Sequence, residues 1–189
     1  ALVLCTILSA QSTAYAQAGT LDDSYGDGGW NTTTISGTGT NGINRSFFAS
    51  DGTIISVVSQ DNGFMLHRTE ADGTEIGTTP VQQYGPGSLN NQVRAAAMLA
   101  NGKLLVAGSY LALGDRIAIA RYNPDLTLDA TFGAGGMTVV DLGSSIQLVR
   151  GILVLADDRI LVSGGASNVS NQPSVALVMP QMTLISVVL

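Results

Sequence analysis

The chain has 189 residues, of which 45% are hydrophobic, 12% are charged and 23 are glycine, and its net charge is −6. The length is sufficient for one sizeable domain, and the charged share is about half of that in an average globular protein. The negative charge argues against nucleic acids and anionic membrane surfaces as partners, because both require basic patches. No segment has the roughly 18 or more consecutive apolar residues of a membrane helix.

The first residues have the pattern of a secretory signal peptide. The apolar run over residues 1–8 is followed by small polar residues and then by Ala14-Tyr15-Ala16, an A-x-A cleavage site. We predict a signal peptide over residues 1–16, clipped of its charged N-terminal part, and a mature start at Gln17; a buried first strand is the alternative. Cys5 would leave with the signal, so the mature chain would hold no disulfide. The predicted location is secreted, periplasmic or cell-surface.

A repeat of about 54 residues, a length typical of propeller units, runs through the rest of the chain. A threonine recurs at one position of the repeat, as Thr20, Thr74, Thr127 and Thr183. Turn dipeptides recur at residues 51–52, 101–102 and 157–158, and the Gly-rich corner over residues 128–136 repeats residues 21–29. The middle copy of this corner, near residues 79–84, has lost the motif. These registers predict one repeat domain over residues 17–189, with units at approximately 19–73, 74–126 and 127–183.

The predicted strands follow one another with short turns and no helix between them. In chain order they include residues 43–49, 64–68, 95–100 and 103–107, and the last unit takes its four strands from 137–142, 151–156, 160–163 and 175–178. Asp51-Gly52 and Asn101-Gly102 predict type I′ hairpin turns, which need positive φ. Several strands are apolar without alternation, which is typical of sheets covered on both faces. We therefore predict an all-β fold of about three propeller-like blades, each with four antiparallel strands, forming an open or incomplete β-propeller.

Two segments resemble a known repeat family. Residues 95–109, AAAMLANGKLLVAGS, and residues 120–136, ARYNPDLTLDATFGAGG, are similar to the delta-60 repeat, a β-propeller-like repeat of bacterial secreted and surface proteins. The resemblance covers residues 19–183, with Tyr25 in place of the family's Phe in the first copy. It implies a propeller-like architecture and a secreted setting. It implies no reaction or ligand, because members of the family generally lack a known activity.

Few residues point to a metal or a cofactor. Asp22, Asp23 and Asp27 gather at the first Gly-rich corner and could bind Ca²⁺ through their oxygens, although aspartates that bond their own backbone in a turn explain them as well. Residues 37–42 satisfy G-x-G-x-x-G, but a strand follows where a dinucleotide site needs a helix, so we interpret them as a loop. His67 is the single histidine, and its place in a strand favours a structural role. No cofactor is predicted.

Three arginines repeat with the blades. Arg45, Arg94 and Arg150 each open the strand before a unit's central turn, six or seven residues ahead of it. Basic side chains at one register would ring a propeller axis and bind an anion or an acidic sugar. The alternative, which the net charge favours, is that they are exposed strand ends or partners of nearby carboxylates.

Together these features predict a secreted or cell-surface scaffold without catalysis. A protein or glycan partner would bind at the long polar loops over residues 36–42, 84–91 and 166–173, and exposed end blades would favour self-association. One alternative is a secreted propeller lyase or hydrolase that uses Asp115, Asp141 and Asp157, although these do not align between blades. The other alternative is a fragment of a longer repeat protein.

Overall fold

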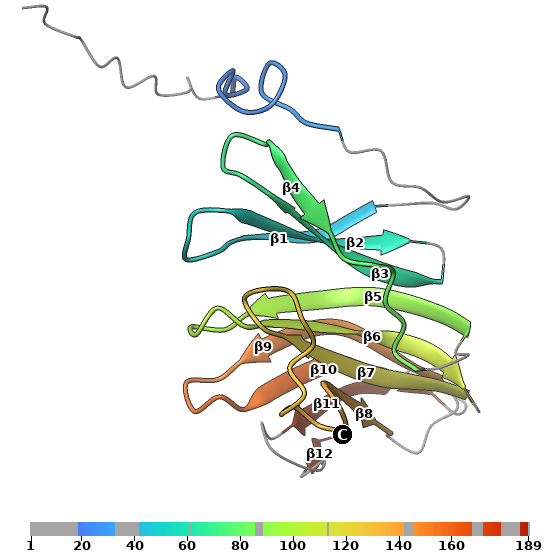
Figure 1. Cartoon of the computed structure of the whole chain (residues 1–189). Coiled ribbons are helices and arrows are strands. Elements are labelled where there is room, and N and C mark those ends of the chain that lie inside the picture. Colours follow the sequence, from blue (N-terminus) through green and yellow to red (C-terminus); the bar gives the residue numbers. More distant parts are fainter. Residues whose placement is uncertain are drawn as a thin grey trace, which may run out of the picture.

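The computed structural model describes residues 19–32, 42–60, 62–85, 89–112, 114–141, 146–167, 172–178 and 186–188. The predicted signal peptide lies outside these residues, as do residues 36–41 and 168–171 of the two predicted loops. Within the described ranges the regular secondary structure is entirely β (Figure 1). The same ranges contain no candidate membrane-spanning helix.

The described strands form three antiparallel sheets of four strands, one after another along the chain (Figure 1). The sheet orders are β1-β2-β3-β4, β5-β6-β7-β8 and β12-β11-β10-β9, and none of the sheets closes on itself. The all-β, open propeller-like prediction is therefore confirmed. The strands are β1 (Gly42–Phe48), β2 (Ile54–Gln60), β3 (Gly63–Thr69), β4 (Glu75–Thr78), β5 (Leu89–Met98), β6 (Leu104–Ala112), β7 (Gly114–Tyr122), β8 (Met137–Val140), β9 (Ile146–Val154), β10 (Ile160–Ser167), β11 (Gln172–Val178) and β12 (Ser186–Val188).

The hydrophobic core lies between the sheets. One cluster of buried side chains joins the first sheet to the second, and another joins the second to the third. Successive residues of β6 alternate between them: Leu104 and Val106 belong to the first cluster, Leu105 and Ala107 to the second, and all four are at most 1% exposed. The middle sheet is therefore buried on both faces, as its continuous apolar runs predicted.

The hairpin turns share one backbone form, which is not the predicted type I′. In each turn the N–H of the fourth residue bonds to the C=O of the first, as from Gly52 to Ala49, and only the fourth residue has positive φ. Type I′ would need positive φ at the two central residues instead. A side chain just before the left-handed residue stabilises the turn by accepting a backbone hydrogen bond, as Asp51 does from Thr53. The left-handed residues are Gly52, Gly73, Gly102, Leu126 and Asp158.

The strand predicted to open the last unit belongs to the sheet before it. β8 pairs with β7, with Met137 opposite Ala120, so it is the outer strand of the second sheet. The Gly-rich corner over residues 128–136 turns the chain back so that the two strands can pair. The third sheet takes its outer strand in the same manner, since β12 pairs with β11.

The middle unit lacks the Gly-rich corner because the chain between its turn and its outer strand is shorter. Met137 pairs opposite Ala120 in the second sheet, and Thr78 pairs opposite the equivalent residue, His67, in the first sheet. Ten positions separate Thr127 from Met137, but only four separate Thr74 from Thr78. β4 therefore follows its turn directly.

Candidate functional site

A β-bulge recurs at one place in the first strand of each sheet. In β5 the bulged residue is Arg94, which has no residue directly opposite on β6, although both of its neighbours do. In β9 the bulged residue is Arg150, and in β1 it is Asn44. Arg45 therefore lies one position out of register with the other two arginines, which corrects the predicted row.

The bulge directs Arg94 out of the sheet. Val93 and Ala95 on either side are each 3% exposed, whereas Arg94 is exposed. Because both faces of this sheet are covered, the side chain leaves by the free edge of β5, as bulges commonly allow. Arg45 and Arg150 are exposed as well. We call these three residues the first-strand arginines.

The first strands lie along one edge of the stack. β5 contacts β1 of the sheet before it and β9 of the sheet after it. The hairpins that join the first two strands of each sheet all point to the same side of the molecule (Figure 1). Equivalent positions in β1, β5 and β9 therefore follow one another along this edge.

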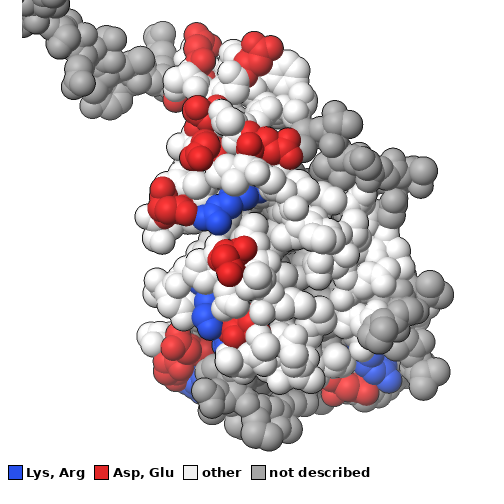
Figure 2. All heavy atoms as spheres, viewed as in Figure 1, with Lys and Arg blue, Asp and Glu red and all other residues white. Residues whose placement is uncertain are grey.

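The first-strand arginines differ from the other cations of the chain in their partners. Every other Lys or Arg lies within 3.1 Å of a carboxylate: Arg68 of Asp51, Lys103 and Arg121 of Asp129, Arg116 of Asp141, and Arg159 of Asp157. On the face shown in Figure 2, the Lys and Arg atoms accordingly lie beside Asp and Glu atoms. Among the described residues, no carboxylate lies within 4 Å of Arg45, Arg94 or Arg150, and the bond that Arg94 donates goes to the neutral amide of Gln92.

Asp129 is the centre of a structural cluster in the Gly-rich corner over residues 128–136. Its Oδ2 lies 2.7 Å from Lys103 Nζ and 2.6 Å from Arg121 Nε, and its Oδ1 accepts bonds from the N–H and hydroxyl of Thr131. The Arg121 guanidinium also lies 4.6 Å from the centre of the Phe132 ring. These hydrogen bonds, led by that of Lys103, hold the pKa of Asp129 well below its usual range. The cluster fastens the corner to the β5–β6 turn through Lys103 and to β7 through Arg121.

The calcium candidates lie at the first corner, on the surface. Asp22 Oδ1 accepts hydrogen bonds from the Ser24 hydroxyl at 2.6 Å and from its N–H at 3.0 Å, which lowers the pKa of Asp22. This is the geometry of a turn-forming aspartate. In the described ranges, no three His, Cys, Asp or Glu side chains, Asp23 and Asp27 included, are grouped so as to hold a metal ion.

Two other predicted positions are internal. His67 is 7% exposed in β3, and its Nε2 lies 3.7 Å from Glu75 Oε1. The loop over residues 84–91 is anchored at its two ends, because the Tyr84 N–H donates to Asn91 Oδ1 and both residues are buried. The two end residues of this loop are therefore internal, and partner binding at the loop stays a prediction.

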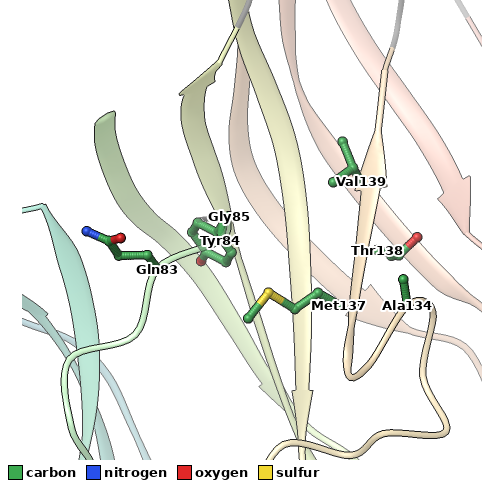
Figure 3. Close-up of a pocket in the computed structure, with 7 residues that line it drawn as sticks. All are labelled: Gln83, Tyr84, Gly85, Ala134, Met137, Thr138 and Val139. Atoms are coloured by element: carbon green, nitrogen blue, oxygen red, sulfur yellow. The ribbon is translucent and has the colours of Figure 1, made fainter. Parts of the chain in front are cut away.

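A groove of about 550 Å³ opens between the connector that leaves the first sheet and the outer strand of the second sheet (Figure 3). Its lining is mostly apolar and includes no charged side chain, and Met137 points across it toward Gln83 and Tyr84. Such a lining suits binding by shape and apolar contact rather than acid–base chemistry. No pattern in the sequence indicated this groove. Its lining residues are Gln83, Tyr84, Gly85, Ala134, Met137, Thr138 and Val139.

Stacked four-stranded antiparallel sheets with the core between them define a β-propeller-like repeat protein. Residues 99–132 match a family model described as a β-propeller domain of unknown function, DUF5122. The match runs from the β5–β6 turn through β6 and β7 to Phe132 of the corner, and it overlaps both segments that carry the resemblance in sequence. Comparison with curated proteins gives no match. The narrower delta-60 assignment and the secreted setting stay predictions.

Proposed function

We propose that the chain is an exported binding scaffold of the delta-60 type, which presents side chains at fixed positions to a macromolecular partner and catalyses no reaction. The observation that carries this proposal is the burial of the middle sheet on both faces. A sheet packed in this way holds its edges and connections in place, and binding residues usually lie on such edges and loops of a rigid scaffold. The signal-peptide pattern over residues 1–16 supports export.

The carboxylates favour a scaffold over a lyase or hydrolase. Asp141 follows the outer strand of the second sheet, whereas Asp157 lies in the first turn of the third. Asp141 forms an ion pair with Arg116, and Asp157 forms one with Arg159. An enzyme of either class needs acid–base groups that converge on one pocket, and the groove of Figure 3 is lined by no carboxylate.

The binding proposal is tested with the exported protein on an array of glycans and cell-surface polymers, with heat-denatured protein as the control. We expect retention of at least one polymer above the control. Turnover of a polysaccharide, or retention no greater than that of denatured protein, would contradict the proposal. N-terminal sequencing of the exported chain should begin at Gln17, and a retained leader would contradict export through cleavage.

A further inference from the structure

The first-strand arginines are the cations of this acidic chain that no described carboxylate neutralises. Each guanidinium presents N–H donors in a planar fork that fits the two oxygens of a carboxylate or sulfate. An exposed arginine that already shares a carboxylate gains little from a second anion, whereas one without such a partner can use its full charge. Anion capture is therefore concentrated at the first-strand edge despite the net charge of −6.

The recurrence of the bulge sets the spacing of these charges. Arg94 and Arg150 occupy the same bulge in adjacent sheets. Packed sheets lie about 10 Å apart, which is wider than one small anion can bridge. A polymer whose acidic groups recur along its length can contact both arginines at once, which gives the gain of a second linked contact.

The neutral polar groups on either side of Arg45 favour a carbohydrate polymer. The exposed strand β1 presents the Asn44 amide and the Ser46 hydroxyl, which bond to Ser59 and Ser56 of β2. Such neutral groups exchange hydrogen bonds readily with sugar hydroxyls. Double-stranded nucleic acid carries one charge per about 1.7 Å and would be repelled by the negative chain, whereas a polysaccharide with at most one acidic group per sugar is less densely charged.

We infer that the first-strand edge binds a linear acidic polysaccharide, with Arg94 and Arg150 on its acidic groups and Arg45 at the end of the row. This inference rests on the proposed binding function and names its site and ligand class.

The test is a titration of the full chain with polygalacturonate at low ionic strength, alongside dextran as an uncharged polymer and poly-glutamate as an acidic peptide. Arg94→Gln and Arg150→Gln should each weaken polygalacturonate binding about three- to fivefold, and the double variant about tenfold or more. The salt dependence of binding should become shallower in the double variant. The matched control is Arg159→Gln, which removes the same charge from an arginine already paired with Asp157 and should leave affinity unchanged.

Several results would overturn the inference. These are equal binding of dextran, no binding of polygalacturonate, tighter binding of poly-glutamate, or an equal loss in Arg159→Gln. If the double variant aggregates but still binds polygalacturonate, the arginines only protect sheet edges from pairing with other chains. Binding of another polymer that is indifferent to Arg94 would overturn this inference and leave the proposed function standing.

If the double variant fails to fold, a gain-of-function variant tests the same site. Asn44→Arg places a cation at the equivalent bulge of β1. It should tighten polygalacturonate binding, and an unchanged affinity counts against the site.

Discussion

Aspartates of the same turn chemistry contribute differently according to their burial. Asp129 and Asp157 both accept a backbone hydrogen bond from the residue two positions on. The Asp129 side chain is 4% exposed and is bonded by two cations, whereas the Asp157 side chain is 55% exposed and pairs with Arg159 at the surface. Solvent screens the Asp157–Arg159 pair more strongly than the pairs that Asp129 forms with Lys103 and Arg121. The charge of Asp129 therefore contributes more to stability than the charge of Asp157.

Asp129→Asn should lower the free energy of unfolding by about 2–3 kcal/mol, because it leaves Lys103 and Arg121 without their shared carboxylate. Urea denaturation followed by circular dichroism measures this loss. The matched control is Asp157→Asn, which keeps the turn acceptor and should cost clearly less than Asp129→Asn, because solvent screens the ion pair with Arg159. Equal losses in the two variants would show that the cluster contributes no more than a surface ion pair.

At the scale of elements, the turns differ in what packs on them. The N–H of Gly26 in the first corner bonds to the Asp72 C=O at 2.6 Å, and the Tyr25 ring lies against Gly73. A Cβ on Gly73 would lie 3.2 Å from Gly26 N and 3.3 Å from the ring. The equivalent turn of the second sheet has Leu126 at the left-handed position, where its side chain packs on the cluster between the first and second sheets. Gly73 therefore lies at the place where the first corner docks.

Gly73→Ala should release the first corner from the first sheet. Trp30, the single tryptophan, directly follows this corner and is already 56% exposed, so its emission should show a small further shift toward that of a fully solvated indole. The loss in unfolding free energy should be about 1–2 kcal/mol.

Gly52→Ala is the matched control for this substitution. It has nearly the same φ, 86° against 89°, but nothing lies within 4 Å of the added Cβ. It should therefore carry the backbone strain alone and leave the Trp30 spectrum unchanged. A spectral shift as large in Gly52→Ala would show that the corner responds to strain rather than to contact.

At the scale of the whole molecule, the middle sheet is expected to resist local opening more than the outer parts of the stack. β6 and β7 belong to the sheet that is packed on both sides, whereas β1 and β4 are edge strands made mostly of exposed residues. Local opening of an edge strand exposes little apolar surface, while opening of the middle sheet disrupts both clusters at once.

Hydrogen exchange should therefore be graded across the stack. Amides of β6 and β7 should exchange at least about 100-fold more slowly than those of β1 and β4, because their opening approaches global unfolding. Mass spectrometry of peptides from each strand measures the difference. Uniform rates across the sheets would mean that the stack unfolds as one unit without a protected centre.

The sequence by itself determined the period, the strand-rich composition and the burial of the middle sheet on both faces, because turn dipeptides and continuous apolar runs are local signals. It was wrong about the turn type, since Asp-Gly and Asn-Gly fit any turn with a left-handed residue. Tertiary structure alone decided that residues 137–140 complete the preceding sheet, that Asn44 rather than Arg45 matches the bulge at Arg94, and which arginines have a carboxylate nearby. These facts depend on pairing between residues far apart in the chain, where a shift of one position changes the side chain that reaches solvent.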